Sequence, residues 1–556
     1  MKKVLTLSLI TTSLMIGATI PNTDDLQKTI NVPNEVKKIQ DEKKEGVVEI
    51  QGKKEYAPIM VDDKSGKKIY VKDCEFEGNE HISANELNEL IKEFKDKELS
   101  FVELQNIASI ITKEYRNKGY FVARAYVPKQ NIQENKDVLK IAIIEGNYGE
   151  FKLNNNSRVK DSIVQGMLDD AKQRDNAINT NTLERSLLII NETPGVIVTQ
   201  ADVKPGEEVG TSDFIIKTES SNLYKGYVAA DNYGSKYVGK NRMMAGVDVE
   251  SPFKIGDELS LSGMISNGAD LKNYKIAYNV PLMSNGLRGE ISYANTDYNL
   301  VKLGSGIIDE EYYGDTKTIE AKVIYPIIKS KDEKLDFTAT YSNKDISSTT
   351  DETDVKKINV IELGFSHEKN QKILSKDSIV RLEGMFTVGE LDDENTMNGS
   401  YQKISVNTGI DMNFTPIYSM STNLQMQKAF KNKNLDGTED MSVGGINGVK
   451  VFPDAELSAE NAIVLNTEVF AKLPEIMAYK HKVGLFYDVG TATMSDKTID
   501  STFESRTLQD IGIGYYSNYK NAFSKVQLAR VVGGEKIQTE EEGDKTRLLL
   551  QAGWVF

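Results

Sequence analysis

A change of hydrophobic periodicity near residue 222 constrains the fold of this chain more than any other feature of its sequence. Upstream, several segments carry apolar residues at helical spacing, whereas downstream apolar and polar residues alternate one by one up to the C-terminus. Leu335, Phe337 and Tyr341, for example, fall on one face of such a segment. Because strict alternation is typical of β-strands with one apolar face, residues 222–556 are predicted to be all-β.

The length and the ending of this β region favour a closed antiparallel transmembrane barrel. Strands of about 10 residues, joined by short and long connections in turn, would give about 16 strands in residues 222–556. The last strand carries Trp554 and Phe556 on its apolar face, and the 25 tyrosines suit the aromatic girdles of such barrels. A soluble β-sandwich or β-solenoid is the alternative, but no obvious second sheet would cover the apolar faces.

Bulk composition does not exclude such a barrel. The mean hydropathy is −0.42 and the net charge is −15, and no stretch beyond the N-terminus reaches the about 18 apolar residues of a membrane helix. Alternating strands average out in hydropathy, so a polar composition is compatible with a barrel. The acidic balance disfavours a nucleic-acid partner, which usually requires a basic patch. The single cysteine, Cys74, excludes an intrachain disulfide and a cysteine-based metal site.

The N-terminal segment has the pattern of an exported protein. Two lysines precede an apolar stretch at residues 4–18, an order that is typical of secretory signals. Residues 1–18 are therefore predicted to be a signal peptide, and a buried N-terminal helix is the alternative. Residues 19–68 are rich in charged residues and lack apolar periodicity, which predicts a flexible linker with a short helix near residues 35–45.

One order of elements occurs twice between the linker and the β region. A strand around residues 69–76 is followed by two helices, each opened by a Ser-x-x-Glu capping box, and then by strands at residues 120–127 and 138–145. The same β-α-α-β-β order is predicted again downstream, with its elements at residues 150–153, 160–171, 182–191, 196–203 and 213–218. Two α+β modules are thus predicted, at residues 69–147 and 148–218.

The two modules resemble POTRA domains. The resemblance rests on Gly78-Asn79, on the segments 115–120 and 122–130, and on Ile144-Glu145-Gly146. It implies a free sheet edge, to which an extended chain can add by β-augmentation. The residues expected to bind a substrate on this edge strand are Tyr120, Val122, Arg124 and Tyr126. A role as mere spacers is the alternative.

Several motifs of the β region resemble the outer-membrane transporters of two-partner secretion, the hemolysin and filamentous hemagglutinin secretion-activation proteins. These motifs occupy residues 231–239, 256–259, 278–282, 444–453 and 486–490. The resemblance covers residues 69–556 and implies a loop near residues 442–456 that folds back into the barrel lumen. The implied lumenal loop motif consists of Gly444, Gly445, Asn447, Gly448, Val449, Lys450 and Phe452. The implied inner-wall motif of the barrel consists of Phe486, Asp488 and Gly490.

One position departs from the pattern of the family. The family usually has an arginine in the loop motif, followed by glycine, whereas this chain has Lys450 followed by Val451. The resemblance implies that the cation of the loop faces Asp488. A lysine can form this ion pair as a point charge, but it lacks the bidentate fork of arginine, so a looser anchor is expected. The alternative is that Lys450 only lines a wet pore.

The resemblance implies a protein of the outer membrane with its POTRA domains in the periplasm. The implied function is secretion of one large hemolysin- or adhesin-like exoprotein, recognised by its N-terminal secretion domain and driven by folding outside rather than by nucleotide hydrolysis. The lumenal loop would obstruct the pore at rest. Family members often have a plug helix before the first POTRA domain, joined by a Pro-rich linker, but residues 19–68 contain only Pro21, Pro33 and Pro58, so this sequence leaves the presence of a plug helix open. Other expected partners are outer-membrane lipid and the barrel-assembly machinery that inserts the barrel.

Signs of enzyme chemistry are nearly absent from the sequence. His81, His367 and His481 are far apart, and no nucleotide-binding or nucleophile motif occurs. No catalytic residue, cofactor or metal site is therefore predicted. The main rival function is a barrel-assembly factor, which usually carries more POTRA domains. A passive porin or adhesin would leave the modules unexplained, and a soluble β-rich surface protein is more remote.

Overall fold

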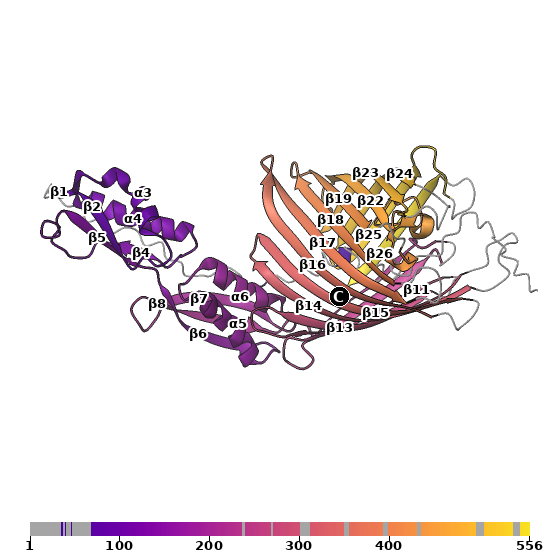
Figure 1. Ribbon diagram of the computed structural model, residues 1–556, viewed down its shortest axis with the longest axis horizontal. Coiled ribbons are helices and arrows are strands. Elements are labelled where there is room, and N and C mark those ends of the chain that lie inside the picture. Colours follow the sequence, from indigo (N-terminus) through magenta and orange to yellow (C-terminus); the bar gives the residue numbers. More distant parts are fainter. Residues whose placement is uncertain are drawn as a thin grey trace, which may run out of the picture.

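The computed structural model describes residues 35–36, 39, 46, 68–235, 239–267, 271–300, 312–349, 355–392, 399–430, 435–495, 505–537 and 545–556. The predicted signal peptide and most of the predicted linker lie outside these residues. Figure 1 shows two small α+β units in a row, followed by a large barrel in which the C-terminus lies.

The first α+β unit packs two helices on a three-stranded sheet beside a smaller two-stranded sheet. Its elements are β1 Lys68–Val71, β2 Asp73–Glu77, α3 Ala84–Leu90, β3 Lys97–Ser100, α4 Phe101–Asn117, β4 Arg124–Tyr126 and β5 Val138–Ile144. The central strand β5 runs parallel to β2 and antiparallel to β4, while β1 pairs with β3. Ser100 and Glu103 form a capping box that satisfies N–H groups at the start of α4. The buried face of α4 includes Ile107, Ile111 and Tyr115, which anchor the core of this unit.

The second unit repeats this arrangement next to the barrel. Its elements are β6 Asn147–Asn156, α5 Asp161–Arg174, α6 Thr180–Glu192, β7 Ile197–Pro205 and β8 Thr211–Glu219. The middle strand β8 runs parallel to β6 and antiparallel to β7. Phe151 and Phe214 stack in its core with their ring centroids 5.4 Å apart. Each unit therefore has a hydrophobic core of its own.

Two strand predictions in the first unit are wrong in their extent. The strand predicted at residues 120–127 is only Arg124–Tyr126, because the residues before it form a turn. The backbone N–H groups of Tyr120, Phe121 and Ala123 donate to the carbonyls of Tyr115, Gly119 and Tyr120, respectively. The single strand predicted around residues 69–76 is divided into β1 and β2, and β3 was not predicted at all. Apolar side chains occur in the turn as well as in the strand, so alternation alone does not mark the boundary between them.

Within the described residues, sixteen antiparallel strands close into the barrel, which confirms the predicted fold class. They are β9 Tyr224–Asp231, β10 Arg242–Glu250, β11 Glu258–Ser266, β12 Lys272–Pro281, β13 Arg288–Leu300, β14 Tyr312–Lys329, β15 Glu333–Thr349, β16 Val355–Ile373, β17 Lys376–Asp392, β18 Gly399–Asn413, β19 Tyr418–Ala429, β22 Asn461–Lys472, β23 Tyr479–Thr493, β24 Ser505–Tyr519, β25 Ala522–Val531 and β26 Thr546–Val555. The ring closes where β26 pairs with β9, from Gln551 opposite Asp231 to Val555 opposite Tyr227. Closure leaves no free edge, as a sheet surrounded by lipid requires.

Alternation along the strands separates an apolar outer face from a polar lumen. In β16, Ile361, Leu363 and Phe365 are exposed on the outside, whereas Glu362 points inward and accepts a hydrogen bond from Thr387. An apolar outer belt of this kind suits the hydrocarbon layer of a membrane. Among the helices of the described residues, none has the length and apolar character to cross a membrane.

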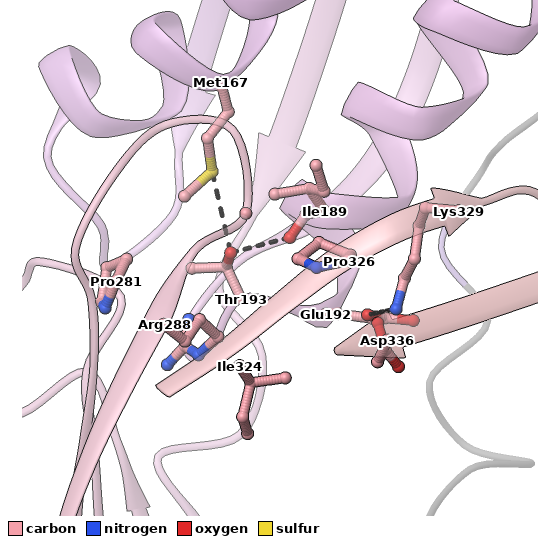
Figure 2. A pocket seen from close by; sticks show the side chains of 11 residues that line it. Met167, Ile189, Glu192, Thr193, Pro281, Arg288, Ile324, Pro326, Lys329 and Asp336 are labelled. Carbon is pink, nitrogen blue, oxygen red and sulfur yellow. Dashed lines mark hydrogen bonds and ion pairs between the residues drawn. The ribbon is translucent and has the colours of Figure 1, made fainter. Parts of the chain in front are cut away.

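The second unit is docked on turns at one end of the barrel. Arg185 of α6 donates to the carbonyl oxygens of Pro326 at 2.5 Å and Asn285 at 3.1 Å. Glu192 forms an ion pair with Lys329, and a cavity of about 150 Å³ lies between the helices and the barrel beside this pair (Figure 2). These contacts hold the second unit against the mouth of the barrel.

One histidine joins the two α+β units. His81 Nδ1 lies 2.5 Å from Oε2 of Glu145 in its own unit, and His81 Nε2 lies 3.2 Å from Oδ1 of Asp175 in the second unit. Burial alone would lower the pKa of His81, but the hydrogen bonds and negative charges of Glu145 and Asp175 raise it above its ordinary value. When protonated, the imidazole can bind both carboxylates and so links one unit to the other.

This link predicts a pH dependence of stability. Because the folded-state pKa of His81 is raised, its stabilisation is fully present below the unfolded pKa of about 6.5 and is lost as pH rises through the folded value. Between about pH 6 and 8 we expect the free energy of unfolding of the units to fall by at most about 1 kcal/mol, since the imidazole is partly exposed and screened. Denaturant titrations of the full chain at several pH values measure this change. His81→Gln should remove it, and an unaltered pH profile in that variant would contradict the assignment.

Candidate functional site

The connection between β19 and β22 folds back into the barrel. Its small elements are η2 Gly437–Glu439, β20 Met441–Ser442, η3 Asp454–Glu456 and β21 Ser458–Ala459, and β20 pairs with β21. Val449 and Phe452 are fully buried, and they pack with Phe486 of β23 and with other inward-facing side chains of the wall. Residues 435–460, which we term the lumenal loop, therefore fill part of the lumen.

Lys450 and Asp488 meet at the tip of the lumenal loop. Lys450 Nζ lies 2.6 Å from Oδ2 of Asp488 and 4.6 Å from the centroid of the Phe486 ring. Asn466 of β22 donates to the other carboxylate oxygen at 2.8 Å and to the carbonyl of Gly448 at 2.7 Å. Only 7% of Lys450 and 0% of Asp488 is exposed. The lysine binds one oxygen as a point charge, and an amide of the wall occupies the second oxygen.

Sequence reasoning missed a second carboxylate beneath the loop. Asp510 of β24 lies directly opposite Asp488 in the strand register, and its Oδ2 accepts the backbone N–H of Val451 at 2.7 Å. Asp510 is fully buried. The available signal was its place in the alternation of β24, where an acidic residue falls on the inward face. The wall therefore binds the backbone of the loop as well as its lysine.

The glycines of the two motifs permit close packing, between the loop and the wall at Gly490 and within the loop at its own glycines. A Cβ atom on Gly490 would lie 2.4 Å from Cγ1 of Val443, and one on Gly448 would lie 2.2 Å from the Val443 carbonyl. Gly445 has a φ of +88°, and a Cβ on Gly444 would lie 2.2 Å from the carbonyl of Pro453. A larger residue at Gly490 would push the loop off the wall, whereas one at Gly444 or Gly448 would disturb the fold of the loop itself.

Asn447 and Phe452 also contribute backbone hydrogen bonds to the loop. Asn447 is exposed, and its carbonyl accepts a hydrogen bond from Gln425 of β19 at 2.7 Å. The carbonyl of Phe452 accepts the N–H of Gly445 at 2.8 Å and closes the tip of the loop. Arg506 of β24, which was not predicted, binds Glu456 of the returning segment at 2.7 Å.

The four residues predicted on the edge strand separate into two groups. Arg124 and Tyr126 lie exposed on β4, at the edge of the sheet. Tyr120 lies in the turn before it, with its ring centroid 5.1 Å from that of His81, and Val122 packs against the core of the second unit. Tyr120 and Val122 thus belong to the joint between the units rather than to the free edge.

Part of the predicted linker lies inside the barrel. Glu35, Val36 and Ile39 are helical, and the two apolar side chains are buried in one cluster with Phe523 and other inward-facing barrel residues. Glu35 Oε1 lies 4.0 Å from Nζ of Lys525 of β25. These residues fill a region of the lumen that the lumenal loop leaves open.

The histidines serve structural contacts in the part of the chain that is described. His367 Nε2 lies 2.8 Å from Glu333, and His481 contacts the Tyr515 hydroxyl at 3.1 Å. The described residues contain no group of three or more side chains that could hold a metal ion.

Comparison with known proteins agrees with this architecture. The family model described as Haemolysin secretion/activation protein ShlB/FhaC/HecB matches residues 210–511, and the model of the ShlB-type POTRA domain matches residues 69–146. The heme/hemopexin transporter protein HuxB of Haemophilus influenzae is 28% identical over 451 residues, which cover 78% of each chain. The hemolysin transporter protein HpmB of Proteus mirabilis is 21% identical over 420 residues, which cover 70% of each chain.

A solved structure shows the same fold. CdiB from Escherichia coli superposes with a TM-score of 0.77 at 18% identity, over 97% of this chain and 100% of that chain. The matched family model spans more than half of the 556 residues. The chain therefore belongs to the haemolysin secretion/activation protein family ShlB/FhaC/HecB, and it is an outer-membrane transporter for protein secretion with POTRA domains in the periplasm.

Proposed function

We propose that this transporter secretes one large hemolysin- or adhesin-like exoprotein through the barrel lumen, with the lumenal loop as the resting obstruction. The observation that carries this proposal is the loop itself, which is buried in the lumen and held at its tip by Lys450 and Asp488. A barrel of sixteen strands encloses a channel wide enough to leak unless it is filled. The short helix around Val36 and Ile39 would add to the closure as a plug.

In this proposal the exoprotein arrives extended and binds the first α+β unit by its N-terminal secretion domain. The exposed side chains of Arg124 and Tyr126 on the edge strand β4 support this assignment. The strand has only three residues, and the N–H of Ala125 already donates to Oγ1 of Thr112 at 2.9 Å. Side chains would therefore contribute more to recognition here than added backbone hydrogen bonds.

The transport step in this proposal makes and breaks no covalent bond. Folding of the exoprotein outside the cell would draw the chain outward without nucleotide hydrolysis. The apolar outer belt would contact outer-membrane lipid, and the barrel-assembly machinery of the cell would insert the barrel. A dedicated transporter and a barrel-assembly factor differ in how many proteins depend on them.

The proposal is tested by comparing secreted and outer-membrane proteins of cells with and without this gene. Loss of one large exoprotein, with the other outer-membrane barrels unchanged, is the expected result and names the partner. Depletion of many barrels would instead assign an assembly function and overturn the proposal.

Lys450→Ala should reduce secretion without preventing insertion of the barrel. The change leaves the carboxylate of Asp488 buried without its cation, which typically costs about 3–5 kcal/mol and weakens the seat of the loop. We expect a several-fold loss of secreted exoprotein at equal barrel level, measured by immunoblot. Lys450→Arg keeps the charge and should secrete normally. Normal secretion by the alanine variant would show that Lys450 only lines the pore.

Replacing Arg124 and Tyr126 together by alanine should weaken binding of the partner's secretion domain about tenfold, since a cation and an aromatic ring are common interface hot spots. The measurement is titration of the full-length transporter in detergent with the secretion domain of the exoprotein that the comparison of cells with and without the gene identifies. The matched control is Glu75→Ala with Glu77→Ala on β2, the opposite edge of the same sheet. Equal effects of both double variants would argue against recognition at β4.

A further inference from the structure

Three lysines of the barrel wall hold the root of the lumenal loop, well away from its tip. Lys344 of β15 and Lys403 of β18 both reach the carboxylate of Glu439, at 2.8 Å and 2.9 Å. Lys356 of β16 pairs with Asp436 at 3.0 Å. None of these residues belongs to the sequence motifs that identified the loop.

Glu439 is held by its backbone as well as by its carboxylate. Lys403 Nζ donates to the Glu439 carbonyl at 2.8 Å, and Nε2 of Gln427 donates to the same oxygen at 2.9 Å. Only 2% of Glu439 and 7% of Lys403 is exposed. With so little solvent, the Lys344 and Lys403 ammonium groups would face each other with much less screening if the carboxylate were removed.

The two lysines converge on Glu439 from separate strands. Strands β16 and β17 lie between β15 and β18. At the usual spacing of neighbouring strands, β15 and β18 are therefore about 14 Å apart. Leu435 adds an apolar contact next to the ion pairs, since it is buried in one cluster with Ile358 and Tyr401 of the same wall. The root of the loop is thus held by ion pairs and by an apolar contact.

The ionic partners of the root and of the tip lie in different sectors of the barrel. The root binds lysines of β15, β16 and β18, whereas the tip binds carboxylates of β23 and β24. Lys450 lies eleven residues after Glu439 in the sequence. The loop therefore crosses from one sector of the wall to another and is fastened at both ends of the crossing.

We propose that Glu439 is a positioning residue, the second and independent anchor of the lumenal loop, through Lys344 and Lys403. Release of the loop then requires that the contacts of Glu439 and those of Lys450 both break. If only one of them breaks, the other still holds the loop against the wall. This inference deepens the proposed function, on which it rests only in taking the loop as the part that closes the pore.

The test measures how often the loop leaves the wall. Val449, which is fully buried, is changed to cysteine in a Cys74→Ala background, so that one thiol reports exposure to a maleimide in detergent-purified protein. We expect Glu439→Gln to accelerate labelling at least tenfold. With Lys450→Ala added, independent anchors should multiply their separate effects, since distant sites combine additively in free energy. Heat-modifiable migration on gels selects folded barrels for each measurement.

Two controls separate positioning from a general loss of lumenal charge. Asp411→Asn removes one of the two carboxylates that bind Arg381 elsewhere in the lumen, and it should label like the parent. Lys403→Arg keeps the positive charge beside Glu439 and should label more slowly than Glu439→Gln. If Glu439→Gln barrels fail to fold, Lys344→Gln provides the same test from the wall side.

The outcomes distinguish the anchoring role of Glu439 from the pore-closing role of the loop. Parent-like labelling of both Glu439→Gln and Lys344→Gln would overturn the inference, as would a double variant no faster than the faster single variant. Conductance in planar bilayers tests the proposed function separately. Faster labelling with a raised conductance supports both the anchor and the closure. Faster labelling with unchanged conductance supports the anchor and overturns the loop as the obstruction.

Discussion

Closure of the sixteen-stranded sheet is the constraint on which the rest of the structure depends. Pairing of β26 with β9 removes the last free edge, so that the backbone of the barrel is satisfied where lipid offers no hydrogen bonds. The same closure encloses a lumen that is too wide for the wall side chains to fill. The lumenal loop and the buried residues around Val36 occupy that space.

The contacts of the lumenal loop with the wall suit a segment that must have a defined position and must also be able to leave it. It joins the wall through side chains and single backbone bonds, such as Val451 with Asp510, and not through continuous strand pairing. Buried ion pairs add little net stability, but they penalise any arrangement that leaves one partner buried without the other. An anchor of this kind defines one position sharply while leaving the energy of release modest.

The second α+β unit is attached to the barrel by contacts of another kind, and the first unit is attached to the second. The second unit is fixed by carbonyl contacts of Arg185 and by the Glu192–Lys329 pair, whereas the first unit is joined to it through His81 and through Val122. Residues that resembled a substrate-binding strand were in part residues of this joint. The prediction placed four residues on one edge because it extended the strand into a turn, and local alternation cannot detect that turn.

By itself the sequence determined most of the elements and their apolar faces, because these depend on spacings of a few residues. Alternation over residues 222–556 indicated a barrel with an outer apolar face, and the local motifs indicated the loop and the wall residue Asp488. Only the tertiary structure decided where the ring closes and which wall groups bind the loop. Asp510 and the lysine partners of Glu439 were not predicted, because strand register and the folding back of a loop bring together residues whose pairing no local pattern encodes.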